Sequence, residues 1–120
     1  MEWKIAAVIG PRNLTMDLSG CIPDSVETII TSNAEGICFC AWKFALERNL
    51  PLLVIKPEYA SETGVEVQDE LYQNSLKLMV DCAQGVVAVW DGKAVEVRKT
   101  LQYARSKKKF VRVYDLRKSD

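Results

Sequence analysis

The chain has 120 residues, and its 16 basic and 16 acidic side chains cancel to a formal net charge of zero. This length fits one domain with a single core, and the neutrality disfavours binding to nucleic acid or to an anionic membrane surface. The sequence has no histidine, which excludes histidine-based nucleophile pairs and zinc sites that need imidazole.

The sequence shows no pattern of a targeting segment or a metal site. Its apolar stretches fall short of the roughly 20 residues that cross a bilayer, and the first expected strand begins without a signal-like leader. We therefore expect a soluble, cytoplasmic protein with no membrane partner. The four cysteines lack the spacing of a zinc ribbon or redox pair. We expect neither a metal nor a cofactor. Cys40 and Cys82 are expected to be buried thiols.

Apolar periodicity and turn residues divide the chain into alternating strands and helices. The expected elements, in chain order, are a strand over 3–9, a helical turn over 16–21, a strand over 25–31, a helix over 34–48, a strand over 52–55, a helix over 64–81, a strand over 86–90, a helix over 94–105 and a strand over 110–114. We therefore predict an α/β fold, a single Rossmann-like three-layer domain over residues 1–120. It has a mainly parallel sheet of about five strands with helices on both faces. Residues 116–120 are expected to be frayed.

Polar or glycine-bearing junctions follow four of these strands, at 10–12, 32–36, 56–64 and 91–93. In a parallel sheet the carboxyl ends of all strands lie on one edge, so the junctions should converge into one ligand-facing rim. Gly10 would let the backbone approach a ligand, and Arg12 would offer a bidentate fork to phosphate or carboxylate. A tight turn with a surface arginine explains this pair equally well.

Ser32, Asn33, Ala34 and Gly36 precede or open the helix expected over 34–48. Free backbone N–H groups and the helix dipole favour an anion at such a position. Ser32 and Glu35 also have the spacing of a capping box, and Glu35 would repel a phosphate from the same turn. Anion binding and plain capping therefore remain alternatives here. A second capping box is expected at Thr63 and Glu66.

Asp91, Gly92 and Lys93 end the strand expected over 86–90. The carboxylate could hold a ribose hydroxyl and the lysine a phosphate, or Asp91 could be only the N-cap of the next helix. Glu96 adds negative charge to the first turns of that helix. Asn74, a poor helix former in the middle of a helix, is expected to point toward the rim.

Six segments resemble, in order and spacing, the small stand-alone members of the SLOG superfamily. That superfamily is a Rossmann-like group that includes the LOG phosphoribohydrolases and the core domain of the DNA-processing protein DprA. The segments are 8–14, 32–37, 49–52, 57–59, 73–74 and 89–93. The resemblance implies a nucleotide or nucleotide-derived ligand at the rim. The positions that match the binding residues of the family are Gly10, Arg12, Ser32, Asn33, Ala34, Gly36, Asn74, Asp91, Gly92 and Lys93.

The chain also departs from the family pattern. Ser32-Asn33 stand where relatives have Gly-Gly or Ser-Gly, and Cys38 stands where an acid ends the A-x-G-I motif. Gln73 replaces an arginine, and Glu96-Val97 stand where a second phosphate-binding Gly-Thr falls. These changes remove backbone access or positive charge, and Glu96 adds negative charge, so the resemblance implies an eroded phosphate site.

Three functions remain open on these grounds. The first is a non-catalytic or weakly catalytic domain that binds a nucleotide-derived small molecule. The second is a nucleotide-cleaving, phosphoribohydrolase-like enzyme that uses Asp91 or Glu35. The third is a homo-oligomeric interaction protein on a degenerate nucleotide-binding scaffold. It is suggested by Phe39, Trp42 and Leu46, which form a second apolar face on the helix expected over 34–48.

Overall fold

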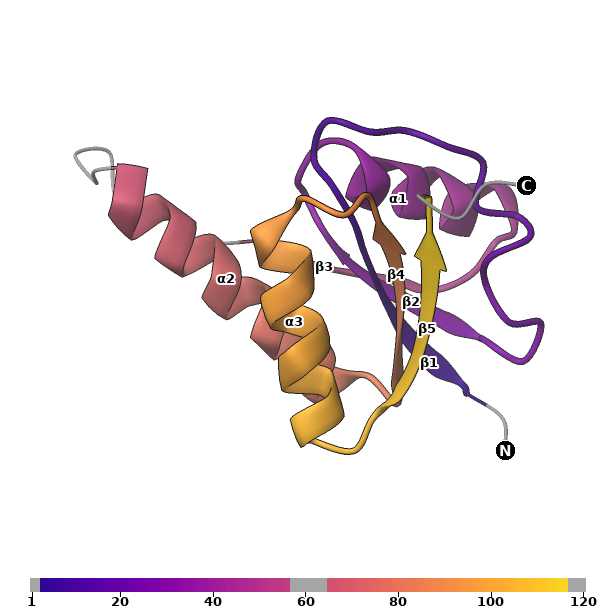
Figure 1. Ribbon diagram of the computed structural model, residues 1–120. Coiled ribbons are helices and arrows are strands. Elements are labelled where there is room, and N and C mark those ends of the chain that lie inside the picture. Colours follow the sequence, from indigo (N-terminus) through magenta and orange to yellow (C-terminus); the bar gives the residue numbers. More distant parts are fainter. Residues whose placement is uncertain (1–2, 57–64, 117–120) are drawn as a thin grey trace.

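The computed structural model describes residues 3–56 and 65–116. Over these residues the chain forms a five-stranded sheet and three helices (Figure 1). The elements, in chain order, are β1 (Ile5–Ile9), β2 (Thr28–Ser32), α1 (Ile37–Glu47), β3 (Leu52–Ile55), α2 (Val65–Cys82), β4 (Gly85–Trp90), α3 (Val95–Ser106) and β5 (Phe110–Asp115). The junction residues 57–64, the capping box expected at Thr63 and Glu66, and the end of the tail lie outside the part for which side chains are described.

All five strands are parallel, in the order β3-β2-β1-β4-β5. The chain moves outward from β1 through β2 to β3, then crosses to β4 and moves outward in the opposite direction to β5. Ile9 at the end of β1 lies opposite Ala88 of β4, so the carboxyl ends of these two strands are neighbours. Ligands of open α/β sheets bind outside the carboxyl ends at such a reversal of strand order.

Helices cover both faces of the sheet (Figure 1): α1 lies on one face, and α2 and α3 lie on the other. Side chains of β1 alternate between the two cores. Ala6 and Val8 pack on the side of α1, whereas Ala7 and Ile9 pack on the side of α2 and α3. A strand buried on both faces is apolar at nearly every position, which is the pattern that predicted it. The predicted α/β, three-layer, Rossmann-like fold is confirmed.

The connection from β1 to β2, residues 10–27, packs beside α1 without forming a helix. The helical turn expected over 16–21 is not a helix: only a single turn forms there, in which the N–H of Cys21 donates to the carbonyl oxygen of Leu18 (2.9 Å). Asp17 Oδ1 accepts hydrogen bonds from the backbone N–H (2.9 Å) and the hydroxyl (2.6 Å) of Ser19. Such local side-chain bonds compete with helix formation. Leu18 and Ile22 are buried in this connection and fix it to the core.

The element bounds differ modestly from those expected. The first strand starts at Ile5, two residues later than expected. Trp3 precedes it as a buried side chain stacked on Phe110, with ring centroids 5.7 Å apart. The second strand starts at Thr28, the residue opposite Ile5, and ends one residue later than expected.

The expected burial of Cys82 is wrong, because this thiol is exposed at the end of α2, and Cys40 is only half-buried. Cys21 and Cys38 are the buried thiols. Among the described helices, none has the length and apolar character needed to cross a bilayer.

Candidate functional site

Gly10 directly follows β1 and lies against the start of α1. A Cβ atom on Gly10 would lie 2.5 Å from Cβ of Ile37, the first residue of α1. Such a separation is shorter than real carbon contacts, so only glycine fits without a shift of the helix. The space beside Gly10 is thus filled by Ile37, and Gly10 allows close packing of strand and helix.

Gly36 joins the start of α1 to the junction that carries Arg12. It has a φ of 75°, and a Cβ atom there would overlap the carbonyl oxygen of Pro11. The N–H of Ile37 donates a hydrogen bond to that same oxygen (3.2 Å). The junctions after β1 and β2 are therefore joined by direct backbone contact, as the convergence of strand ends predicts.

The capping box expected at Ser32 and Glu35 is wrong. The helix begins at Ile37 with Gly36 as its N-cap and without a side-chain cap. Ser32 Oγ instead accepts a hydrogen bond from the N–H of Ala34 (3.1 Å), which closes a local turn. Glu35 precedes the cap, so the first turn of α1 has no acidic side chain to oppose an anion. Asn33 is exposed in the same turn.

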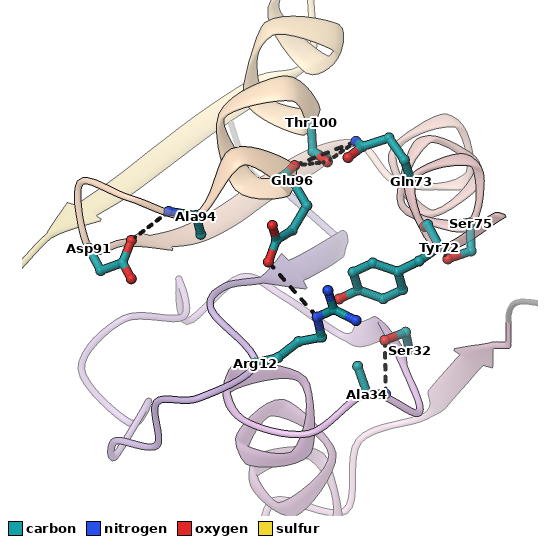
Figure 2. Close-up of polar contacts among 10 residues, drawn as sticks. All are labelled: Arg12, Ser32, Ala34, Tyr72, Gln73, Ser75, Asp91, Ala94, Glu96 and Thr100. Carbon is teal, nitrogen blue, oxygen red and sulfur yellow. Dashed lines mark hydrogen bonds and ion pairs between the residues drawn. The ribbon is translucent and has the colours of Figure 1, made fainter. Parts of the chain in front are cut away.

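Arg12 extends from the β1 junction between α2 and α3 (Figure 2). The carbon of its guanidinium group lies 4.6 Å from the ring centroid of Tyr72, and its Nε lies 3.9 Å from Oε1 of Glu96. The side chains of Arg12 and Glu96 are 46% and 23% exposed. At such exposure each contact contributes about 0.2 to 1 kcal/mol. The contact with Glu96 is made through Nε, and the two terminal nitrogens form the fork that suits a phosphate.

Tyr72 is the buried support beneath Arg12. Figure 2 shows its side chain, from α2, pointing toward Arg12 and Ser32. Burial raises the pKa of its hydroxyl well above the ordinary range, and nearby Cys38 acts in the same direction, against smaller opposing effects of Arg12 and Ser32. The phenol therefore stays neutral at physiological pH. No local pattern in the sequence indicated that the Tyr72 ring would pack against Arg12.

Gln73 and Thr100 join α2 to α3 behind the ion pair. Gln73 Nε2 donates to Thr100 Oγ1 at 2.9 Å and approaches the carbonyl oxygen of Glu96 at 3.5 Å. The hydroxyl of Thr100 donates to that carbonyl oxygen at 2.7 Å. The backbone of Glu96 is thus held by α2, while its carboxylate reaches Arg12 (Figure 2). Gln73 therefore has a structural role in this arrangement.

A cleft of about 490 Å³ lies between the Arg12 junction, α2 and α3. Its charged and amide-bearing lining side chains are Arg12, Glu70, Gln73, Asn74, Lys77, Glu96 and Lys99. Asn74 is exposed and contributes to this lining. Within the described part of the chain, no three Cys, Asp or Glu side chains gather as a metal site requires.

The side chain of Asp91 accepts hydrogen bonds within the turn that follows β4. Its Oδ1 accepts hydrogen bonds from the backbone N–H groups of Lys93 (2.8 Å) and Ala94 (2.9 Å). The bonds from Ala94 and Lys93 hold the pKa of the Asp91 carboxyl below its usual value. The N–H groups of Lys93 and Ala94, beside the start of α3, are therefore bonded to this carboxylate and are not free to bind a phosphate. Gly92, with a φ of 85°, completes the turn, and Lys93 is exposed.

The predicted site residues thus fall into three groups. Arg12 and Asn74 line the cleft. Gly10, Ser32, Asn33, Ala34 and Gly36 form the junctions after β1 and β2, the first of which carries Arg12. The turn of residues 91–93 does not contribute to the lining described for the cleft.

A larger groove, of about 690 Å³, runs between α1 and residues 15–19. Its lining includes none of the predicted site residues. It lies on the α1 side of the sheet, whereas the Arg12 cleft is bounded by α2 and α3. The Arg12 cleft is therefore the better candidate site, although it is the smaller of the two.

No family model matches the chain, and no curated protein or solved structure shows a significant similarity to it. The candidate site therefore depends on the geometry described above.

Proposed function

We propose that the protein binds a nucleotide-derived small molecule in the Arg12 cleft and does not cleave it. The observation that carries this proposal is the position of the Arg12 guanidinium, beside the strand-order reversal and with its terminal nitrogens available as a fork. Arginine binds phosphate oxygens in a bidentate manner, and this geometry gives both strength and specificity. Lys77 and Lys99 add positive charge to the same cleft.

The rigid surroundings of Arg12 support this proposal. The junction is fixed by the Pro11 to Ile37 hydrogen bond and by the packing of Gly36. The ring of Tyr72 then limits the directions that the guanidinium can take. A side chain whose directions are already restricted loses less conformational entropy when a ligand binds.

A phosphoribohydrolase-like activity is less well supported by the rim carboxylates. A general acid at neutral pH needs a raised pKa, whereas the pKa of Asp91 is lowered by its backbone bonds. Glu35 is exposed ahead of α1 and does not contribute to the cleft lining described above. Both candidate acids are therefore poorly placed for proton transfer to a ligand held by Arg12.

Thermal unfolding with a panel of nucleoside monophosphates, ADP-ribose and ribose 5-phosphate tests the proposal. A ligand at about 100 times its Kd adds about 2.7 kcal/mol to the free energy of unfolding. We expect this stabilisation in the wild type and in Arg112→Ala, a matched loss of an exposed arginine on β5, but not in Arg12→Ala. No shift at millimolar ligand, or equal shifts in both variants, would contradict the proposal.

Self-association through α1 is a second candidate function. The helix buries Ile37, Ala41 and Ala45 against the sheet, yet Phe39 and Leu46 on its outer side are 60% and 64% exposed. A helix that is apolar on two faces is typical of an interface, here with a second copy of the chain.

Analytical ultracentrifugation tests this second candidate. We expect a concentration-dependent dimer that dissociates in a Phe39→Ser, Leu46→Ser double variant. A matched Leu78→Ser variant, which alters an exposed leucine on α2, should leave the dimer intact. A monomeric wild type at high concentration would exclude this candidate.

A further inference from the structure

The Arg12 cleft continues along the seam between α2 and α3. Both helices run from the carboxyl edge of the sheet toward its amino edge (Figure 1). Lys77 lies one turn beyond Gln73 on α2, and Lys99 lies one turn beyond Glu96 on α3. The two lysines, which both line the cleft, are therefore further from the carboxyl edge than the residues that surround Arg12.

Tyr103 of α3 gathers two ammonium groups at this far end of the seam. Its ring centroid lies 5.8 Å from Nζ of Lys77 and 5.5 Å from Nζ of Lys107. Its hydroxyl donates a hydrogen bond to Oδ1 of Asp81 on α2 (2.7 Å). This bond raises the pKa of the Tyr103 hydroxyl, which therefore keeps its proton at physiological pH. The ring thus spans the two helices, and a cation from each helix lies against it.

The two ends of the seam differ in charge. At the Arg12 end, one cation is accompanied by two carboxylates, those of Glu70 and Glu96. At the Tyr103 end, three cations are accompanied by one carboxylate. The cations of this end are Lys77, Lys99 and Lys107, and the carboxylate is that of Asp81. An anionic group at the Tyr103 end is therefore attracted by an excess of positive charge that the Arg12 end lacks.

The two ends are too far apart for one phosphate to use both. The Arg12 side chain contacts Glu96, and Tyr103 lies two turns beyond Glu96 on α3, a rise of about 10 Å. The phosphates of a diphosphate share one oxygen and remain adjacent to each other. Two phosphates on different carbon atoms of a ribose are further apart, so that one can lie at each end.

We propose that the Tyr103 end of the cleft is a second anion subsite, and that the ligand is a nucleotide derivative with two separate phosphate groups. One phosphate binds the terminal nitrogens of Arg12. The other binds the ammonium groups of Lys77 and Lys107 beside the Tyr103 ring. This inference rests on the proposed function and assigns its ligand class.

Isothermal titration calorimetry with three adenosine nucleotides tests the second subsite. The nucleotides are the 5′-monophosphate, the 5′-diphosphate and the 3′,5′-bisphosphate, of which the last two have the same number of phosphates in different places. We expect the bisphosphate to bind the wild type at least about fivefold more tightly than the monophosphate, because two further cations are contacted. It should also bind more tightly than the diphosphate. The three corresponding guanosine nucleotides allow for a preference for the other purine.

Variants of the lysines locate the effect. In a Lys77→Gln, Lys107→Gln double variant the bisphosphate and the monophosphate should agree within about twofold, because the two positive charges are gone. A Lys77→Arg, Lys107→Arg double variant keeps the charges and should keep the advantage of the bisphosphate. The matched control is Lys4→Gln, Lys43→Gln, which removes the same charge from the start of the chain and from α1. It should keep the wild-type ratio.

The outcomes separate this inference from the proposed function. Arg12-dependent binding of the monophosphate with no gain from a second phosphate would overturn the second subsite and leave the proposed function standing. An equal gain with the diphosphate would overturn the separation of the two subsites. A gain that persists in the Lys77→Gln, Lys107→Gln variant would overturn the role of these lysines. Absence of binding to the wild type by every nucleotide tried would overturn both the inference and the proposed function.

Discussion

Gly36 is the residue on which the position of the Arg12 junction most directly depends. Its positive φ and its contact with the Pro11 carbonyl are both incompatible with a side chain. Gly20, in contrast, has open space around its missing Cβ. The two glycines therefore provide a test of the same chemical change in opposite surroundings.

We expect Gly36→Ala to lower the free energy of unfolding by about 1 to 3 kcal/mol, because alanine is strained at this φ and meets the Pro11 carbonyl. Gly20→Ala should change it by less than about 1 kcal/mol. Urea denaturation of both variants measures the difference. Equal stabilities of the two variants would show that the contact at Gly36 is not restrictive.

Tyr72 should make the protein sensitive to alkaline pH. The pKa of its hydroxyl is raised in the folded state above the ordinary value of 10.0, mainly by burial. Because the folded chain holds this proton more strongly than the unfolded chain, the stabilisation is complete below about pH 10 and is lost as the pH rises further. We expect urea denaturation to show a steeper loss of stability above this pH in the wild type than in Tyr72→Phe.

Tyr114→Phe, which removes a phenol from β5, is the control for this experiment. Its stability should follow the pH dependence of the wild type. Parallel curves for all three proteins would contradict the role assigned to the Tyr72 proton.

At the scale of elements, α2 and α3 define the cleft because they are joined near its base. The bond between Gln73 and Thr100 links the two helices, and Thr100 is buried. A double-mutant cycle with Gln73→Ala and Thr100→Val should give a coupling energy of about 0.5 to 1.5 kcal/mol. Gln73→Ala combined with Gln102→Ala, which alters an exposed residue of α3, should be additive within about 0.5 kcal/mol. Additivity in both cycles would mean that this hydrogen bond does not couple the helices.

The elements that sequence reasoning predicted best are those whose local pattern agrees with their tertiary surroundings. The apolar runs of β1 and β4 are buried on both faces, so the pattern alone was sufficient. The capping box at Ser32 and Glu35 failed because the contact of Gly36 with the Pro11 carbonyl sets the start of α1. That contact joins the junction after β2 to the junction after β1, so no local sequence pattern predicts it.

The candidate site was predictable only in part for the same reason. Arg12 and Asn74, which line the cleft, were predicted because strand ends converge and because asparagine is unusual within a helix. The ring of Tyr72 and the carboxylate of Glu96 meet Arg12 only after α2 and α3 have packed side by side. The spacing of residues along the chain gives no information on these contacts between separate elements. Asp91 was correctly assigned to the strand end, but its bonds to Lys93 and Ala94 required the turn geometry.

At the scale of the whole molecule, stability should decrease from the centre of the sheet to its edges. The strands β1 and β4 are paired on both sides and almost wholly buried, whereas the edge strands β3 and β5 are mostly half-exposed. We expect the amides of β1 and β4 to exchange hydrogen only through global unfolding, and those of β3 to exchange faster by local opening. Hydrogen exchange followed by NMR measures both. Equal protection across the sheet would indicate that a partner covers its edges.

The guanidinium group of Arg12 is held by two weak contacts, with Tyr72 and Glu96. The strength of these contacts also determines how quickly the group can rearrange when a ligand enters the cleft. Rearrangement of one half-exposed side chain takes picoseconds to nanoseconds, whereas closure of a lid or domain takes microseconds or longer. Exchange of the proposed ligand at Arg12 would then require, among the described residues, only this side-chain rearrangement. The proposed ligand should enter and leave the cleft at rates set by diffusion and affinity.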